Sequence, residues 1–372
     1  MKRVFYFITC MFALTLASCS NDENAASEVE AQAANLTITL SGKSTTSRSV
    51  GALPTSTTDP TTGEGKVDRI AVGVFDANGK VIIINEPTIA TTSSNLTATV
   101  TATTAATDVI VVANATSGYF TGITTKTDFL AKAAELSWTS SSTSTVDSQD
   151  QSLPMVGENS SITATSGTET NAVSVSLSRL VARISISSIT TSFTGTAYVN
   201  SSFKPKEIFL YNAIAEKYFS GSDLSPVTYY SGESTATTSP TLAAYLGTGD
   251  VTAGIVISDP YYYYTFANTT TTPTKLVIKG TFTDASGAAT TVYYPIIINH
   301  AQTGTTTSGG TAYTPPDGTD SKITANTAYK LSAIIKTIGV SSPSADIGPA
   351  ALALTVTVSD WANTLTQDVI FN

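Results

Sequence analysis

Short stretches in which apolar residues alternate with Ser or Thr recur along this chain, and they restrict it to a sheet structure. Leu36, Ile38 and Leu40 alternate with threonines, and residues 172–190 continue the same pattern over a longer span. Alternation with a period of two places one set of side chains on each face of a strand. A chain rich in Thr, Val, Ile and Tyr, with few Lys and Glu, favours strands further. We therefore predict a mainly β fold with few short helices.

The individual turns, strands and one helix follow from the same sequence patterns. Turns are predicted at Asp76–Gly79, where Asn-Gly suits a tight hairpin, and at Asp284–Gly287. A helix is predicted over 128–136, with Thr127 or Asp128 as its N-cap. The predicted strands are 31–41, 67–75, 80–85, 96–100, 109–113, 206–213, 275–284, 290–299, 328–337 and 351–358.

The long stretch 172–190 divides the chain. Its apolar series changes face near Arg179, which suits a strand that leaves one sheet and enters another. A chain of 372 residues is long enough for two ordinary domains. We place the boundary at about residue 178, so that 49–178 and 179–372 are predicted as two β-sandwich domains.

The first nineteen residues have the features of a bacterial lipoprotein export signal. Lys2 and Arg3 precede an apolar run over 4–17, and the small-residue site ends at Cys19. We expect removal of 1–19 and a lipid on Cys19 that anchors the chain to a membrane. The alternatives are an ordinary secretory signal or a short anchor helix. The other cysteine, Cys10, lies inside the signal, so the mature chain is expected to form no disulfide and no thiol site.

The sequence gives no indication of a nucleic-acid, metal or hydrolase site. The net charge is −9, and no basic patch stands among aromatic residues, so we expect no nucleic-acid partner. His300 is the single histidine, and it is expected to be a polar residue at a strand end rather than a base or a metal ligand. Asp76–Gly79 lacks the later ligands of a calcium loop. A hydrolase would need an acid pair such as Asp76 with Glu64, which nothing in the sequence brings together. We expect no enzyme activity, no cofactor and no metal.

Four consecutive tyrosines, Tyr261 to Tyr264, allow two interpretations. We expect a strand start with alternate rings packed inside. The alternative is a stacking platform for a sugar, together with Trp138.

A long polar loop, 42–66, contains Arg48 among small residues. Such loops are readily entered by proteases. A cut after Arg48 would detach the strand with Leu36, Ile38 and Leu40, together with the lipid. The alternative is a solvated arginine without a role.

Several segments, in this order and spacing behind a lipoprotein signal, resemble the FimA-like fimbrillins, the subunits of type V pili. The front of the chain carries the strand 36–40, the segment 47–51 and the strand 70–75. The middle carries Leu-Ser-Arg-Leu-Val-Ala-Arg-Ile over 177–184. The back carries 293–299, 326–331 and 354–361.

The resemblance implies two transthyretin-like β-sandwich domains and a precursor lipoprotein of the outer membrane. It implies that an arginine-specific protease cleaves between Arg48 and Ser49 and removes the propeptide 20–48. The vacated groove would accept the C-terminal segment of another copy, with Trp361, Leu365, Val369 and Phe371 as donor residues. Gln367 interrupts this apolar series, which leaves the donor register open.

The resemblance further implies a homopolymer that works with accessory pilus subunits and forms an extracellular fimbria for adhesion and biofilm. A stalk subunit is the interpretation that we favour, because Arg48 and a well-formed C-terminal segment occur together. The nearest alternative is a tip or anchor subunit of the same pilus. A glycan-binding surface lipoprotein is an alternative from another class.

Overall fold

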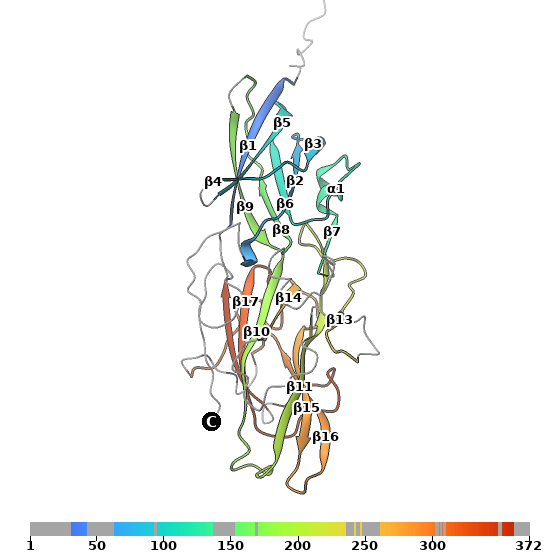
Figure 1. The fold of residues 1–372 in the computed structure, drawn as a ribbon, viewed down its shortest axis with the longest axis vertical. Helices are drawn as coiled ribbons and strands as arrows, with labels where there is room; N and C mark the ends of the chain where they lie inside the picture. Colours follow the sequence, from blue (N-terminus) through green and yellow to red (C-terminus); the bar gives the residue numbers. More distant parts are fainter. Residues whose placement is uncertain are drawn as a thin grey trace, which may run out of the picture. The chain divides into compact units, whose positions relative to one another are not determined.

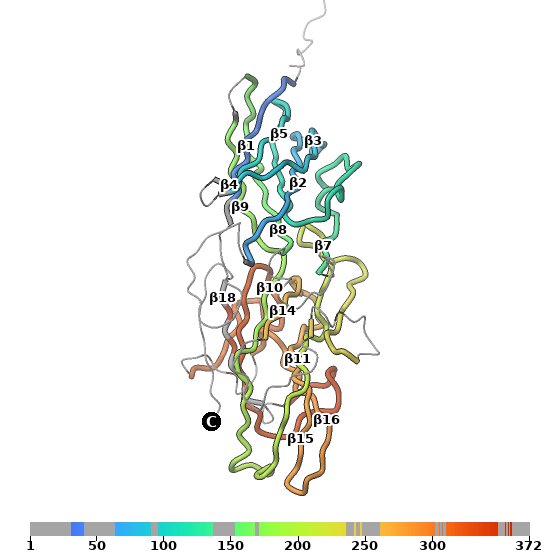
Figure 2. The backbone as a smooth tube through the Cα atoms, in the orientation of Figure 1, coloured from blue at the N-terminus to red at the C-terminus, as the bar shows by residue number. Residues whose placement is uncertain are grey.

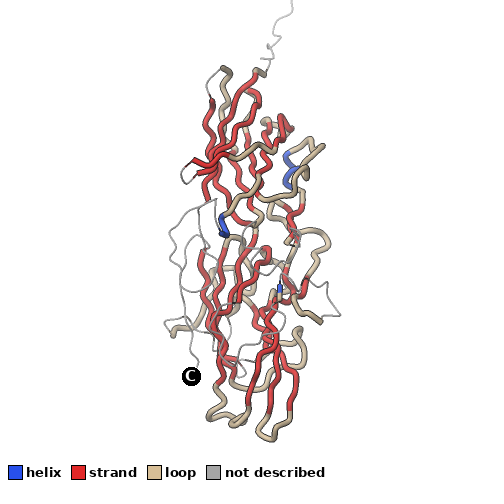
Figure 3. Tube along the Cα trace, viewed as in Figure 1, coloured by secondary structure: helices blue, strands red, loops and turns tan. Residues whose placement is uncertain are grey.

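The computed structural model describes residues 31–42, 63–92, 95–136, 153–167, 170–235, 242, 246–247, 261–301, 305, 307, 310–348 and 352–360. The predicted signal with Cys19, the site at Arg48 and Ser49, Trp138 and the segment from Trp361 onward lie outside the described residues. Residues from Gln32 onward form one compact unit, and the boundary near residue 178 stays a prediction. Strands are the dominant regular structure of the described residues, and helices are few and short (Figure 3), so the mainly β fold is confirmed.

The first half of the chain forms one eight-stranded sheet with the order β3-β2-β6-β8-β9-β1-β5-β4 (Figure 1). β8 and β9 share two register pairs, at the β9 residues Ser178 and Arg179, so the sheet is continuous there over a short distance. β3 also contacts β5, and the sheet thereby encloses a common core. The strands are β1 Ala33–Gly42, β2 Ile70–Phe75, β3 Val81–Asn85, β4 Ala90–Thr92, β5 Asn95–Thr103, β6 Asp108–Ala113, β8 Met155–Asn159 and β9 Thr170–Arg179.

The second half forms two four-stranded sheets, with the orders β14-β10-β17-β18 and β13-β11-β15-β16 (Figure 2). Their apolar faces share a second core. The strands of the first sheet are β10 Val181–Thr191, β14 Tyr261–Phe266, β17 Thr327–Ile335 and β18 Leu352–Asp360. Those of the second are β11 Ser202–Ala213, β13 Tyr230–Ser231, β15 Lys275–Thr283 and β16 Ala289–Ile297.

The predicted helix over 128–136 is wrong in its bounds. The helix α1 is Lys126–Leu130, and Thr125 caps it by accepting a hydrogen bond from the backbone N–H of Asp128. The chain then continues as the strand β7, Ala133–Glu135, which pairs with β12, Glu216–Tyr218. Pairing with a distant segment therefore overrides the local helical preference of this stretch. A single 3₁₀ turn, η1, covers Gly63–Gly65.

The predicted change of face in 172–190 is confirmed. β9 ends at Arg179 and β10 begins at Val181, so Leu180 alone separates strands of two different sheets. Val173, Val175 and Leu177 belong to the first core, whereas Ile184 and Ile186 belong to the second. The chain thus passes directly from one half to the other along a nearly continuous strand.

The two halves repeat one arrangement. In the first, β1 lies between β9, to which it is parallel, and β5, to which it is antiparallel. In the second, β10 lies between β17, to which it is parallel, and β14, to which it is antiparallel. The sequence shows no repeat of fixed period, so this repetition is a finding of the structure. Within the described residues, no helix has the length and apolar character needed to cross a membrane.

Candidate functional site

The candidate functional site is the space between β5 and β9 that β1 occupies (Figure 1). We call this space the β1 slot. β1 pairs with β5 from Ala33↔Thr103 to Leu40↔Leu96, and with β9 from Asn35↔Thr170 to Gly42↔Leu177. The predicted displaced strand is therefore an interior strand with a ladder on both sides.

The apolar side chains of β1 fill the core of the first half. Leu36, Ile38 and Leu40 each have 0% exposure. The strand residues between them, Thr37 and Thr39, are half-buried, as the alternation predicts. Ile38 lies opposite Ala98 of β5 and Val173 of β9, both of which are buried. Removing β1 would therefore expose two strand edges and a line of apolar pockets.

A buried polar cluster lies next to the slot, at the passage from β9 to β10. Glu64, in the turn η1, has 0% exposure. Its two carboxylate oxygens accept hydrogen bonds from Nη1 of Arg183 at 2.8 and 2.9 Å, and Oε1 accepts one from the Tyr264 hydroxyl at 2.6 Å. Its backbone carbonyl accepts a hydrogen bond from Nε of Arg179 at 2.9 Å. We call these four residues the Glu64 cluster.

Burial governs the electrostatics of the Glu64 cluster. Burial raises the pKa of Tyr264 well above its ordinary value, and the neighbouring Glu64 carboxylate raises it further. Burial lowers the pKa of the Arg179 guanidinium, against the attraction of Glu64. A buried charge pair of this kind is costly to break, because removing one partner leaves the other uncompensated. The cluster therefore fixes η1 against β9, β10 and β14.

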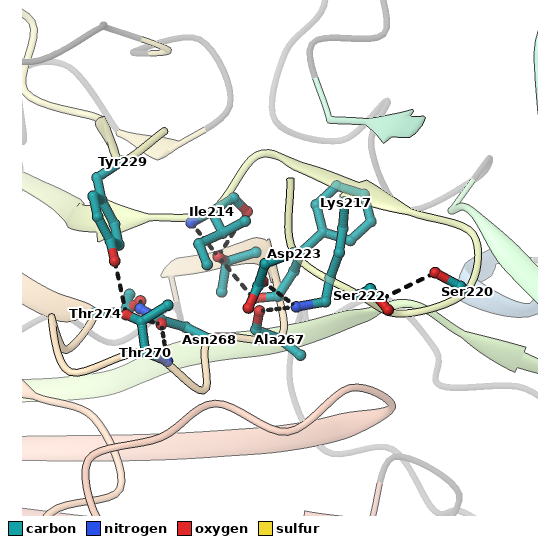
Figure 4. A network of polar contacts seen from close by, with 12 residues as sticks. Ile214, Lys217, Ser220, Ser222, Asp223, Tyr229, Ala267, Asn268, Thr270 and Thr274 are labelled. Atoms are coloured by element: carbon teal, nitrogen blue, oxygen red, sulfur yellow. Dashed lines mark hydrogen bonds and ion pairs between the residues drawn. The ribbon is translucent and has the colours of Figure 1, made fainter. Parts of the chain in front are cut away.

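A second polar network supports the pairing of β12 with β7 (Figure 4). The buried Lys217 of β12 donates from Nζ to Asp223 at 2.5 Å and to the Ala267 carbonyl at 3.0 Å. Nearby, the Asn268 amide donates to Thr274 Oγ1 at 3.0 Å, and the Tyr229 hydroxyl donates to Thr270 Oγ1 at 2.8 Å. The network thus anchors the β12 segment, which contributes a strand to a sheet shared with the first half.

Two other candidates from the sequence, His300 and Asp76, have local hydrogen-bond partners. Nδ1 of His300, just beyond β16, lies 3.1 Å from Asp320 and 2.9 Å from the Ser321 hydroxyl. The Asp76 carboxylate accepts hydrogen bonds from the N–H groups of Asn78 and Lys80, which confirms the hairpin turn. In the proposed acid pair, Asp76 is therefore engaged in its own turn and Glu64 in the Glu64 cluster.

The tyrosine run is the strand β14, and its rings alternate between two faces as expected, but both faces are buried. Tyr262, Tyr263 and Tyr264 are all buried, because Tyr262 and Tyr264 pack into the first core and Tyr263 into the second. These three rings are therefore unavailable for stacking on a sugar. Elsewhere, Tyr119 borders a cavity of about 310 Å³, and Nζ of Lys132 lies 4.8 Å from its ring centroid.

The strand β1 is predictable from the sequence, whereas the buried networks are not. Their charged members are Glu64, Arg179, Arg183 and Lys217. The available signal was the presence of charged residues in otherwise apolar strands. Arg179 and Arg183 flank the apolar junction 180–182, and charged groups are rarely buried without a partner. The identity of that partner is not readable locally, because Glu64 precedes Arg183 by 119 residues.

Comparison with known proteins agrees with this architecture. Residues 34–187, less than half of the chain, match the family model described as major fimbrial subunit protein (FimA). That description names a structural subunit. A comparison with curated protein sequences gives no match.

Three solved structures share the fold over most of this chain. A fimbrilin (FimA) from Porphyromonas gingivalis has 21% identity and a TM-score of 0.62, and the match covers 88% of this chain and 98% of that one. A candidate cell adhesion protein from Bacteroides eggerthii has 24% identity and a TM-score of 0.59, with coverage of 89% and 96%. A second such protein, from Parabacteroides distasonis, has 18% identity and a TM-score of 0.59, with coverage of 88% and 100%. The predicted resemblance is thus confirmed: this chain is similar to the FimA-like fimbrillins, by sequence over residues 34–187 and by fold over most of its length.

Proposed function

We propose that this chain is the stalk subunit of a cell-surface fimbria and that it polymerises by strand exchange. In this scheme β1 leaves its slot after cleavage between Arg48 and Ser49, and the C-terminal segment of the next copy takes its place. The observation that carries the proposal is the position of β1. It is an interior strand with a ladder on each side, and Leu36, Ile38 and Leu40 are fully buried.

The departure of β1 would leave two unpaired strand edges and empty apolar pockets. Unpaired N–H and C=O groups on β5 and β9 form an edge that readily pairs with another chain. A strand from a second copy restores both ladders, and its apolar residues refill the pockets. Each large side chain buried there contributes about 1.5–3 kcal/mol before ordering costs are subtracted. Because the donor and the slot are different parts of the chain, the contact is head-to-tail and builds a filament when the rotation does not close.

The same scheme accounts for the ends of the sequence. The precursor would reach the outer membrane with a lipid on Cys19, and β1 would occupy its own slot until processing. Cleavage after Arg48 would release the chain from the lipid and open the slot. Trp361, Leu365, Val369 and Phe371 are the proposed donor residues. The extracellular polymer, with accessory tip and anchor subunits, would serve adhesion and biofilm.

Treatment of the purified precursor with an arginine-specific protease tests this function. We expect polymers that appear as SDS-resistant ladders, with subunits that begin at Ser49. An Arg48→Gln variant, and a chain that ends at Asp360, should both remain monomeric under the same treatment. Normal fibres from the shortened chain would overturn strand exchange.

The sequence of the N-terminus also separates the alternatives. Subunits that begin at the lipidated Cys19 in surface extracts would indicate an anchor subunit or a simple lipoprotein. A monomer that binds sugars on a glycan array would indicate a glycan-binding protein instead.

A further inference from the structure

The strand β9 depends on β1 for most of its ladder. Within the described residues, β9 pairs with β1 from Thr170 to Leu177, but it pairs with β8 at Ser178 and Arg179. One further bond joins the two strands, from the Asn159 side chain of β8 to the Ser174 carbonyl at 2.9 Å. Gly157 of β8 also lies against the Ser176 backbone. An empty β1 slot would therefore leave the N-terminal part of β9 without a paired neighbour, and β9 would be held from Ser174 to its C-terminal end.

The Glu64 cluster acts at that end. Arg179, the last residue of β9, donates to the Glu64 backbone carbonyl, and the Glu64 carboxylate binds Arg183 of β10 and Tyr264 of β14. These contacts do not involve β1, so they persist when β1 leaves. They also fix η1, which lies on the Ser49 side of the proposed cleavage site and therefore remains with the subunit.

We propose that Glu64 is a positioning residue for strand acceptance: it holds β9 in place while the slot is empty, so that the slot keeps the spacing that an incoming strand from a second copy requires. This inference rests on the proposed function. A preformed β1 slot binds an incoming strand faster and more tightly than a slot that must first be reassembled, because fewer residues become ordered on binding.

The chemistry of Glu64 makes a conservative test possible. Replacement of Glu64 by glutamine keeps the shape of the side chain but removes the negative charge that compensates Arg183. Breaking a buried charge pair is strongly destabilising locally. With β1 present, the ladders of β9 with β1 hold the strand independently of Glu64. The effect of Glu64→Gln should therefore be larger in the empty form than in the intact form.

The experiment compares intact precursor with Arg48-cleaved protein from which the β1 segment has been removed. The probe is a fluorescent peptide with the sequence of residues 361–372. In Glu64→Gln, we expect peptide association to slow by about tenfold or more, a factor that corresponds to about 1.4 kcal/mol. Hydrogen exchange at Val173 and Val175 should rise in the empty form and change little in the intact form.

Two further variants make the result specific. Glu86→Gln changes an exposed glutamate that binds Ser117 and Gly118, and it should behave as the unmodified protein. Tyr264→Phe removes one hydrogen bond to Glu64 and keeps the charge pair, so it should slow peptide association by a smaller factor. If Glu64→Gln fails to fold intact, Tyr264→Phe decides the question.

Each outcome has a definite meaning. Unchanged peptide association and unchanged exchange of β9 in the empty variant would overturn the role of Glu64 and leave the proposed function standing. An equal loss of stability in the intact and empty forms would also overturn it, because Glu64 would then serve the fold alone. Failure of the unmodified empty protein to take up the peptide would overturn the proposed function itself.

Discussion

Ile38 shows how much of the first core depends on one side chain of β1. It is fully buried between Ala98 of β5 and Val173 of β9. Ile38→Ala should lower the free energy of unfolding of the intact precursor by about 2–5 kcal/mol, because it removes buried methyl groups and leaves a cavity. Denaturant unfolding measures this change. Thr37→Ala, on the half-buried face, should change stability far less, and similar losses for both variants would contradict the assigned facing.

Residues differ in how far the sequence predicts them. Leu36, Ile38 and Leu40 were predicted as one buried face, because alternation within a single strand determines which side chains share a face. Glu64 was not, because its Gly-Glu-Gly context indicates a loop and its partners are distant in sequence. Burial of a charge depends on groups that only the fold brings together, so local patterns do not reveal it.

At the scale of elements, the free edge of β16 is protected by a segment that we call the strap, residues 336–348. Val340 of the strap and Tyr293 of β16 exchange two backbone hydrogen bonds, at 2.8 and 2.9 Å. The backbone nitrogen of Pro295, two residues further along β16, faces the same edge. Because proline has no N–H, it cannot donate a hydrogen bond to an added strand there. Nζ of Lys275 binds the Ser344 and Ala345 carbonyls and the Asp346 carboxylate at 3.1 to 3.2 Å. Protection of this edge discourages strand addition at a site other than the β1 slot.

Lys275→Ala should loosen the strap and expose the edge of β16. We expect the intact precursor of this variant to self-associate, with a concentration-dependent increase in sedimentation coefficient. Lys204→Ala, which removes an exposed lysine of β11, is the matched control and should remain monomeric. If Lys275→Ala remains monomeric over the whole concentration range, the lysine is not needed. Pro295 and Val340 would then protect the edge without it.

Elements with strong alternation were predicted well, and those formed by distant pairing were not. The strands β1, β2, β3, β11, β15, β16, β17 and β18 lie within a few residues of their predicted bounds. The strand β7 was mistaken for the end of a helix, because its three residues become a strand through pairing with β12. Short strands obtain their stability from a partner rather than from their own pattern.

At the scale of the whole molecule, the half-buried Tyr230 and the buried Tyr294 and Tyr313 connect stability to alkaline pH. Burial and the hydrogen bond to Glu216 raise the pKa of Tyr230 to about 12, and burial raises the pKa values of Tyr294 and Tyr313 as well. Tyrosines of the unfolded chain ionise near 10. Their contribution to stability is therefore complete below pH 10 and is lost as the pH rises from 10 toward 12.

The melting temperature should accordingly fall steeply between pH 10 and 12, while ultraviolet absorbance reports tyrosine ionisation that coincides with unfolding. Tyr230→Phe removes one of these groups, so its melting temperature should depend less on pH in this window. Ionisation of all the tyrosines near pH 10 in the still-folded protein would contradict the burial of Tyr294 and Tyr313.

The near-continuity of β9 and β10 has a mechanical consequence for a fibre joined as proposed. β1 and β9 run parallel, so a donor strand that takes the direction of β1 would also run parallel to β9. β10 and β17 are parallel as well, and β18, the neighbour of β17, leads toward the donor segment. Tension along these strands would load the two ladders in shear, so that many hydrogen bonds resist together instead of unzipping one after another. With a single leucine between β9 and β10, little slack separates the two loaded ladders.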